Sequence, residues 1–461
     1  MKLCSQNRKP EKYKQTEAMF YRRSYKCVYL KSIAIFVVVL FVLSVKPGFL
    51  RVPSENHHPH RFIKSFPITT TVNITPKVIT IFQTINYKDK YCVLYYLWDY
   101  DSEFATMKNA VTLVLHASPT HLKHLEAQIR SWTGPISVAV FVPTPEDTQI
   151  RKSGIRVKAI FSAIRKLEKR LLAIQNDRSQ IALHVFFEKK GTSECPTLNI
   201  SRNFDLEFPV ELDEMEHFTL PVKLYPINAG RNIAREGVMS DLFISGDAEQ
   251  VYSDGFEKVM SMIGAELIIK QKRKVALVHR RFEVADNVEL PRNKAELKKL
   301  LANDSAVPFH KFVYPIGHEI RYLDDWLACP DDIYNAVIVP YNNTLWEPQF
   351  VAANNIETPF HDERFPYRFK SNTHLAVLLC YHDFTFAVVD NIFSVHRGIK
   401  YNQTLENEFL YTYGKRNGLH QIFNIFNNEL NETYPASKVD QCGTLWFDVP
   451  QNVTLKSNCT S

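Results

Sequence analysis

The sequence predicts an α/β protein built on a mostly parallel β-sheet with helices on both faces. Two observations carry this prediction. From about residue 108, short runs of β-branched and other apolar residues alternate with longer amphipathic segments, which is the pattern of strands connected by helices. Hydrophobic residues make up 45% of the chain and charged residues 23%, so a large core can form and wholesale disorder is excluded.

The chain begins with a strongly basic segment that precedes an apolar run. Residues 1–26 hold eight Lys or Arg side chains and two acidic ones, whereas the rest of the chain is almost electrically balanced. The positive charge therefore does not indicate a nucleic-acid-binding surface. Residues 33–43 are unbroken apolar sequence, and 27–45 approaches the roughly 20 residues that a membrane-spanning helix needs.

We expect residues 27–45 to be a signal-anchor helix rather than a cleaved signal peptide, because residues 44–47 (Ser-Val-Lys-Pro) are a poor small-residue cleavage site. Positive charge on the N-terminal side keeps residues 1–26, the basic tail, in the cytosol. Residues 46–461 then lie in a lumen, and the protein is a single-pass type II membrane protein.

The sequons and cysteines are typical of a domain that lies in the lumen. Eight N-x-[ST] sequons, each an N-glycosylation candidate, occur at Asn73, Asn199, Asn303, Asn342, Asn402, Asn431, Asn452 and Asn458. Beyond the anchor, six cysteines permit up to three disulfides in an oxidising compartment, with the connectivity left open. The alternative is that several of these cysteines are small buried apolar residues.

The elements follow in order along the chain. Residues 46–88 are predicted to be an irregular stem, since they contain several prolines and a His-rich tract that is a solvated linker or, alternatively, binds metal. Apolar runs predict strands at 111–116, 135–142, 181–187, 242–245, 275–278, 336–339 and 386–389. Amphipathic spacing predicts helices at 119–132, 159–175, 228–239 and 367–380. Residues 441–461 are expected to be a tail.

Several common functional motifs are absent. Only 14 glycines occur, and the chain contains no G-x-G-x-x-G, G-x-x-x-x-G-K-[ST], H-E-x-x-H, G-x-S-x-G or C-x-x-C. The usual dinucleotide, P-loop, zinc-protease, hydrolase-elbow and redox classes are therefore excluded.

The first chemically informative segment directly follows the predicted strand 242–245. Asp247 and Glu249 follow it, two residues apart, and can present two carboxylates at the carboxyl end of a strand, where open α/β sheets bind ligands. Such oxygen donors suit Mg²⁺ or Mn²⁺, which can hold a diphosphate. Arg231 and Arg235 lie four apart on one helix face, where they can meet the same phosphates or simply form a solvated surface.

Four further blocks complete a pattern. They are W-T-G-P-I-S-V at 132–138, W-E-P-Q-F-V at 346–351, H-D-E-R-F at 361–365 and V-H-R-G-I-K at 395–400. Together with R-N-I-A-R-E-G at 231–237, they resemble glycosyltransferase family 49 over about residues 108–440. The sequence departs from the family at its D-x-D motif, which is here Asp247-Ala248-Glu249.

The resemblance implies a GT-A-type catalytic domain over 89–440, with a nucleotide-sugar half at 108–260 and an acceptor half at 261–440. It implies a Golgi enzyme that transfers a sugar from a UDP-sugar to a glycan or glycoprotein acceptor, with inversion and with Mn²⁺ or Mg²⁺. Glucuronic acid is the first choice of donor sugar, and xylose and N-acetylglucosamine stay open. A catalytically lapsed, glycan-binding or chaperone-like Golgi protein is the alternative, because Glu249 departs from the D-x-D motif.

The resemblance also implies roles for individual residues. Asp247, Glu249 and His396 would bind the metal, while Arg231, Asn232, Arg235 and Asp247 would bind the donor. Trp346 and Glu347 would line the acceptor side. An inverting transferase needs a carboxylate that accepts a proton, and we expect Asp362 in that role with Glu363 binding the acceptor. Alternatively, Asp362 caps the following helix and Glu363 pairs with Arg364.

Overall fold

The structure is a computed structural model of the whole chain. It describes residues 69–74, 77–143, 153–176, 179–201, 204–207, 225–320, 322–330, 334–402 and 412–447. By its contacts the chain divides into one unit of Met1–His60 with Ala328–Pro330 and a second unit of Arg61–Leu327 with Asp331–Ser461. The predicted anchor, 27–45, lies outside the described residues. Within the described stretches of the chain, no helix has the length and apolar character needed to cross a membrane.

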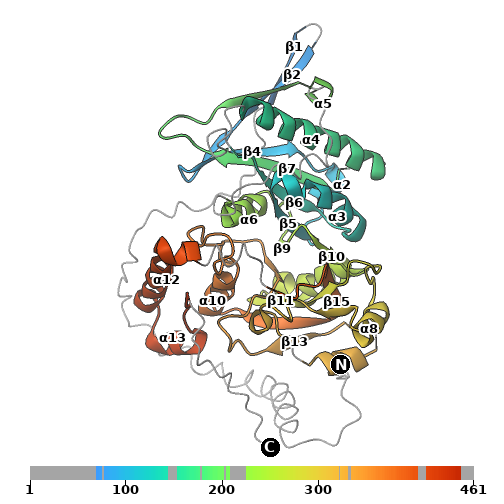
Figure 1. Cartoon of the computed structure of the whole chain (residues 1–461), viewed down its shortest axis with the longest axis vertical. Coiled ribbons are helices and arrows are strands. Elements are labelled where there is room, and N and C mark those ends of the chain that lie inside the picture. Colours follow the sequence, from blue (N-terminus) through green and yellow to red (C-terminus); the bar gives the residue numbers. More distant parts are fainter. Residues whose placement is uncertain are drawn as a thin grey trace, which may run out of the picture. The chain divides into compact units, whose positions relative to one another are not determined.

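The second unit is built on a large mixed sheet (Figure 1). Among the described residues this sheet has 12 strands, in the order β10-β15-β11-β14-β9-β5-β6-β7-β4-β3, with β12 paired to β11 and β13 paired to β15. The bounds are β3 Ile85–Tyr87, β4 Tyr91–Trp98, β5 Val111–Ala117, β6 Ile136–Phe141, β7 Ile181–Glu188, β9 Leu242–Ser245, β10 Gln250–Tyr252, β11 Val275–Val284, β12 Ala306–Pro308, β13 Ala336–Val339, β14 Phe350–Ala353 and β15 Thr385–Arg397.

The strand directions bear out the expected parallel sheet only in its first half. β9, β5, β6 and β7 are parallel neighbours, and β11 is parallel to β15. β14 runs antiparallel between β9 and β11, and β4, β10, β12 and β13 also pair antiparallel. The expectation of a mostly parallel sheet is wrong for the second half of the chain, because an apolar run of four residues reveals a strand but not its direction.

Helices cover both faces of the sheet. The helices are α2 Ser102–Ala105, α3 Leu125–Ser131, α4 Ser153–Ile174, α5 Phe204–Glu207, α6 Ile227–Glu236, α7 Phe256–Gly264, α8 Lys294–Ala302, α9 Leu323–Ala328, α10 Thr373–Tyr381, α12 His420–Thr433 and α13 Ala436–Cys442. 3₁₀ turns span Pro119–His124 and Pro315–Gly317, and a π-helical segment spans Ala265–Lys270. The predicted helix 119–132 is therefore a 3₁₀ turn followed by α3.

The alternation of side chains along the strands explains the two layers. Leu113 of β5 and Val138 of β6 face the cluster that contains α3 and α4, whereas Val114 and Ala139 face the cluster that contains α6. All four side chains are completely buried. Strands buried on both faces are apolar at every position, which is why the sequence shows continuous apolar runs there.

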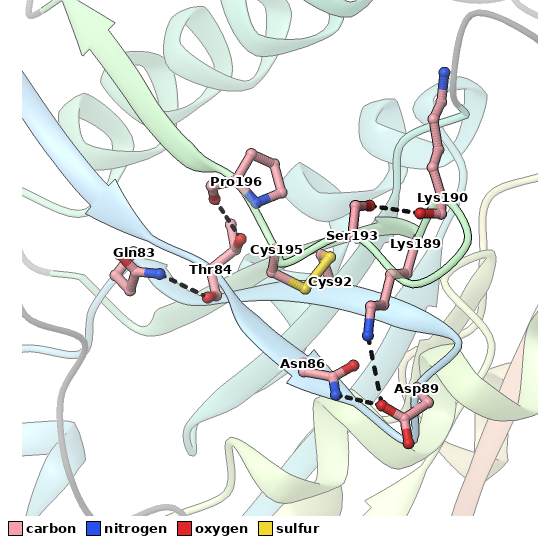
Figure 2. Close-up of a disulfide and its surroundings, with 10 residues drawn as sticks. All are labelled: Gln83, Thr84, Asn86, Asp89, Cys92, Lys189, Lys190, Ser193, Cys195 and Pro196. Carbon is pink, nitrogen blue, oxygen red and sulfur yellow. Dashed lines mark hydrogen bonds and ion pairs between the residues drawn. A yellow bond between two sulfur atoms is a disulfide. The ribbon is translucent and has the colours of Figure 1, made fainter.

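A second, smaller sheet occupies a portion of the predicted stem. Its strands are β1 Thr69–Ile74, β2 Lys77–Gln83 and β8 Thr197–Ser201, in the order β1-β2-β8 and all antiparallel. With β3, these strands correct the expectation of irregular chain up to residue 88. The Cys92–Cys195 disulfide ties the segment before β8 to β4, and the Thr84 hydroxyl donates to the Pro196 carbonyl at 2.5 Å (Figure 2).

The predicted tail is also partly folded. Cys442 at the end of α13 forms a disulfide with Cys380 of α10, and Leu445 is 1% exposed in the cluster of α10 and α12. Of the eight sequon asparagines, Asn199, Asn303, Asn342, Asn402 and Asn431 are exposed. Asn73 lies on β1, and Asn452 and Asn458 lie outside the described residues.

Candidate active site

The predicted Asp-Ala-Glu segment forms the turn between β9 and β10. β5 and β9 are parallel, with Val114 opposite Ser245, so their carboxyl ends meet at this turn. The Gln128 amide donates to the carbonyl groups of Ala248 and Gln250, at 2.7 and 2.6 Å, and holds the turn from α3. These hydrogen bonds therefore fix the turn at the edge of the sheet where ligands of α/β proteins bind.

Gly246 has to be glycine for this turn to pack. A Cβ atom there would lie 2.4 Å from the Tyr252 hydroxyl oxygen and 3.0 Å from Leu113 Cδ1. Both neighbours are buried, so neither can move away cheaply. The backbone before Asp247 is thereby fixed against β5 and β10.

Strand pairing brings Glu249 and His396 together. β10 pairs with β15 so that Gln250, the residue after Glu249, lies opposite His396. The Glu249 Oε2 atom is 3.3 Å from His396 Nε2, and its Oε1 atom is 3.5 Å from His121 Nε2. The hydrogen bonds from His121 and His396 hold the pKa of Glu249 well below its usual range. Glu249 is therefore ionised between two imidazoles.

Asp247 has different neighbours from Glu249. Its Oδ1 is 3.6 Å from Arg231 Nη2, its Oδ2 is 3.8 Å from Arg281 Nη1, and the Gln349 amide donates to Oδ2 at 2.9 Å. The Arg231 and Arg281 side chains are only 7% and 8% exposed. Two buried guanidinium groups face the Asp247 carboxylate, and guanidinium groups are well suited to bind an anionic group such as a diphosphate.

The metal ligands expected from the sequence are only partly assembled. Glu249 and His396 are in contact, but the Asp247 carboxylate faces the two arginines instead. No group of three or more His, Cys, Asp or Glu side chains able to hold a metal ion occurs within the described ranges. His396 Nδ1 is buried without a hydrogen-bond partner among the described residues, and its Nε2 atom faces Glu249. The carboxylate–imidazole pair suits a divalent cation as two of its ligands.

Two of the predicted donor-binding residues, Asn232 and Arg235, make hydrogen bonds within the fold. Asn232 of α6 is completely buried, and its amide donates to the His361 carbonyl and to Glu363 at 2.8 Å each. Arg235 is 3% exposed and donates to the carbonyl groups of Asn355, Thr358 and Pro359. Both side chains are buried and engaged in these contacts, and their role in donor binding stays a prediction. Of the two arginines on α6, only Arg231 reaches Asp247.

The two predicted catalytic carboxylates are both engaged. Arg364 donates to both oxygens of Asp362, and its backbone N–H donates to Asp362 Oδ1 at 2.9 Å. Burial raises the pKa of Asp362, but these hydrogen bonds outweigh it and the pKa is lowered. Glu363 accepts hydrogen bonds from Tyr87, Lys88 and Asn232. Arg364 thus pairs with Asp362, not with Glu363 as in the alternative interpretation of the sequence.

The predicted acceptor residues, Trp346 and Glu347, differ in their contacts. The Trp346 ring packs at 5.2 Å from the Phe386 ring, against the core cluster of α6 and α10. Glu347 stays near the charged groups: its carbonyl accepts a hydrogen bond from Arg281 Nη2 at 3.3 Å, and its side chain is 23% exposed. Glu347 therefore belongs to the same cluster as Asp247, whereas Trp346 mainly packs.

Sequence reasoning missed three members of this cluster, His121, Arg281 and Gln349. His121 follows the first strand of the parallel block, and the carboxyl ends of such strands are where ligands bind, so its position was a usable signal. Arg281 lies inside β11, where the pattern predicted a strand only up to residue 278. Gln349 is a buried polar residue whose role depends on the pairing of β14, which sequence does not reveal.

Comparison with known proteins identifies relatives of the whole domain. A family model described as "Glycosyl-transferase for dystroglycan" matches residues 110–435. Beta-1,4-glucuronyltransferase 1 of Mus musculus is 27% identical over 348 residues, which cover 71% of this chain and 77% of that protein. Xylosyl- and glucuronyltransferase LARGE2s of Gallus gallus is 24% identical over 341 residues, covering 73% of this chain and 38% of that protein. The solved structure of S. aureus TarS 1-349 gives a TM-score of 0.30 at 8% identity, over 62% of this chain and 60% of that one, which is too weak to carry an argument.

Proposed function

Since this chain belongs to glycosyltransferase family 49 and is a glycosyl-transfer enzyme, we propose that it transfers glucuronic acid from UDP-glucuronic acid to a hydroxyl group of a glycan acceptor, with inversion at the anomeric carbon. The observation that carries the proposal is the pair of buried arginines, Arg231 and Arg281, on either side of Asp247 at the carboxyl end of β9. That position and that charge suit the diphosphate of a nucleotide sugar. We assign the domain a GT-A-type fold.

The relatives' names support glucuronic acid as the first choice of donor sugar, and they name xylose as well. No residue of the cluster distinguishes these two sugars from N-acetylglucosamine.

We assign Asp247, Glu249 and His396 to a site for Mn²⁺ or Mg²⁺. Glu249 and His396 are already in contact, and Asp247 lies two residues from Glu249 on the same turn. When bound, the ion supplies positive charge to the diphosphate leaving group. Arg231 and Arg281 add to that charge from the protein side.

We place the enzyme in the Golgi membrane, as a single-pass type II protein with residues 46–461 in the lumen. The Cys92–Cys195 and Cys380–Cys442 disulfides support an oxidising compartment, and the five exposed sequon asparagines support the secretory pathway. The basic tail and the apolar run 27–45 support the orientation.

A catalytically lapsed, glycan-binding Golgi protein is the second candidate. It is favoured by one observation: Asp247 faces two arginines rather than joining Glu249 and His396. In such a protein these arginines would neutralise an Asp247 that no longer binds metal.

A screen of UDP-sugars tests the proposal against this alternative. Full-length protein in detergent micelles would be incubated with UDP-glucuronic acid, UDP-xylose or UDP-N-acetylglucosamine, with Mn²⁺ or with a chelator, and UDP release measured. Full-length chain is needed because Tyr87 and Lys88, in the predicted stem, hold Glu363. We expect Mn²⁺-dependent UDP release that is fastest with UDP-glucuronic acid. Absence of release from every donor would favour the lapsed protein.

A further inference from the structure

We infer that Glu347 is the catalytic residue that accepts the proton of the acceptor hydroxyl. The inference rests on the proposed function and names a residue of the same site, in place of the Asp362 that the sequence suggested. Three observations support it: the position of Glu347, the hydrogen-bond partners of its carboxylate, and the partners of the Asp362 and Glu363 carboxylates.

Arg281 places Glu347 beside the proposed diphosphate site. Arg281 Nη1 is 3.8 Å from Asp247 Oδ2, and Nη2 of the same guanidinium donates to the Glu347 carbonyl at 3.3 Å. Gln349, two residues further along, donates to Asp247 at 2.9 Å. The Asp247 carboxylate and the backbone carbonyl of Glu347 therefore contact the same guanidinium group, which places Glu347 at the edge of the proposed diphosphate site.

The Glu347 carboxylate is held by neutral groups. Its Oε1 accepts a hydrogen bond from the Thr373 hydroxyl at 2.5 Å, and its Oε2 is 3.7 Å from His318 Nε2. Arg281 Nη2 lies 2.7 Å from His318 Nδ1, and since arginine only donates, Nδ1 accepts and the ring proton sits on Nε2. Burial lowers the pKa of His318 well below its usual range, so its imidazole is neutral. Among the described residues, no Lys or Arg side chain forms an ion pair with the Glu347 carboxylate within 4 Å, although Arg231, Arg281 and Lys370 act on it electrostatically from further away.

The two carboxylates predicted from sequence, Asp362 and Glu363, are each bound directly to a cation. Arg364 donates to both oxygens of Asp362 and also binds Glu429. Glu363 receives three hydrogen bonds, one of them from Lys88 at 2.7 Å. A carboxylate that is bound to a guanidinium or an ammonium group is a weaker proton acceptor, because the cation stabilises its ionised form. The Glu347 side chain, at 23% exposed, is also open to a ligand.

In the proposed step, the acceptor oxygen attacks the anomeric carbon of the donor, and a new C–O bond forms on the face opposite the diphosphate. The bond between the anomeric carbon and the β-phosphate oxygen breaks, and its electron pair leaves with UDP. The proton of the acceptor hydroxyl passes to a carboxylate oxygen of Glu347, which later releases it to solvent.

Glu347→Gln tests the role, because the amide keeps the size of the side chain and can still bind Thr373. The probe is UDP-glucuronic acid with water as acceptor, since a base also activates water. We expect the kcat for UDP release to fall about 100-fold or more, which is the usual range for losing a general base, while the UDP dissociation constant changes less than about threefold. Glu347→Asp should recover a fraction of kcat, and exposed Glu357→Gln is the matched control.

Several outcomes would overturn the inference. If Glu347→Gln keeps the wild-type kcat while Asp362→Asn loses it, the role returns to Asp362. Loss of UDP binding, or a fall in Tm of both Glu347 variants that accounts for the lost rate, makes Glu347 a donor-binding or structural residue. Failure of the proposed function is distinguishable from these, because the wild-type protein would then neither bind UDP nor release it.

Discussion

At the scale of single residues, the candidate active site has two halves that share the turn 247–249. Asp247 faces a pair of arginines in the anionic-ligand half, and Glu249 faces a pair of imidazoles in the cation half. The two carboxylates are only two residues apart but point to groups of different chemistry. A diphosphate suits the first half and a divalent cation suits the second.

His396→Ala tests the cation half of the site. If His396 binds the cation, its loss should weaken Mn²⁺-dependent binding of UDP by about tenfold or more, because the ion joins the protein to the diphosphate. Isothermal titration of UDP with and without Mn²⁺ measures this. His420→Ala, which removes an exposed imidazole at the start of α12, should leave the binding unchanged. Equal UDP affinity in wild type and His396→Ala would remove His396 from the metal site.

The sequence predicted the contact between Glu249 and His396 but not the environment of Asp247. The first was accessible because both residues lie in recognisable motif blocks. The second depends on Arg281 and Gln349, which come from β11 and from the segment before β14, and no local pattern indicates that β14 lies between β11 and β9. The burial of Arg235 was also not predictable, because an arginine on a helix looks like a ligand contact in sequence and only the fold shows that it is buried.

At the scale of elements, α6 is the helix that holds the segment 355–365 in place. Arg235 and Asn232 donate to carbonyl groups of the segment 355–361, and Asn228 donates to those of Asp362 and Phe365. The Arg235 guanidinium also lies over the rings of Phe243 and Phe360, at 4.3 and 4.0 Å. The conspicuous polar motif on this helix therefore mainly organises a loop.

Arg235→Gln should destabilise the protein without a specific effect on UDP binding. The change leaves buried carbonyl groups without donors, each of which costs ~1–3 kcal/mol, so we expect the free energy of unfolding to fall by about 3 kcal/mol or more. Urea unfolding measures it, and exposed Arg416→Gln is the control. A variant that unfolds like wild type but no longer binds UDP would restore Arg235 to the donor site.

His184 makes β7 sensitive to acid. It is completely buried, accepts a hydrogen bond from the Tyr96 N–H at 3.0 Å, and burial lowers its pKa from 6.5 to about 3. Below pH 6.5 the unfolded chain takes up a proton at this residue and the folded chain does not, so stability is present above pH 6.5 and is lost as the pH falls toward 3.

Unfolding at two pH values tests this effect. Between about pH 7.5 and pH 5 the His184 contribution should decrease the free energy of unfolding by about 2 kcal/mol. His184→Gln cannot titrate, so its loss of stability over the same interval should be smaller than that of wild type by about this amount. Subtracting the pH-dependent change in the free energy of unfolding of His184→Gln from that of wild type removes the effect of the other buried histidines. Identical pH dependence in both proteins would contradict the assignment.

Strands of the parallel block were predicted closely, whereas later elements were predicted short or missed. Residues 242–245 are a strand with the predicted bounds, and β5 and β7 each extend one residue past the predicted end. Of the strands predicted later in the chain, only 336–339 has the predicted bounds. β11 and β15 extend beyond the predicted ends, because polar residues such as Arg280 and Asn391 lie within them. Polar residues end an apolar pattern in sequence, but in the fold Arg280 is paired with Asp390 and remains in the sheet.

At the scale of the whole molecule, the two disulfides between described residues join segments that are far apart in sequence. Cys92 and Cys195 are separated by 103 residues, and Cys380 and Cys442 by 62. The first ties β4 of the large sheet to the chain that enters β8 of the small sheet (Figure 2). The small sheet was not predicted, because its strands come from the supposed stem and from the region after β7.

Removing the first disulfide should cost more stability than removing the second. Closing a loop of about 100 residues stabilises a protein by ~4–5 kcal/mol in the chain-entropy model, and a shorter loop by slightly less. We expect the double change Cys92→Ser with Cys195→Ser to reduce the free energy of unfolding by about 4 kcal/mol, measured in urea. Cys380→Ser with Cys442→Ser is the matched comparison. A negligible effect of the first pair would mean that the small sheet contributes little to stability.

The central claim is transfer of a sugar from a UDP-sugar with inversion, and the most direct measurement is analysis of the product. Full-length protein would be incubated with isotopically labelled UDP-glucuronic acid, Mn²⁺ and glycans released from glycoproteins, and the product's anomeric configuration read by NMR. We expect a new glucuronic acid residue in β linkage, opposite to its α linkage in the donor. The Asp247→Asn variant should give a yield smaller by about tenfold or more. An α-linked product, or no transfer from any UDP-sugar by protein that still binds UDP, would contradict it.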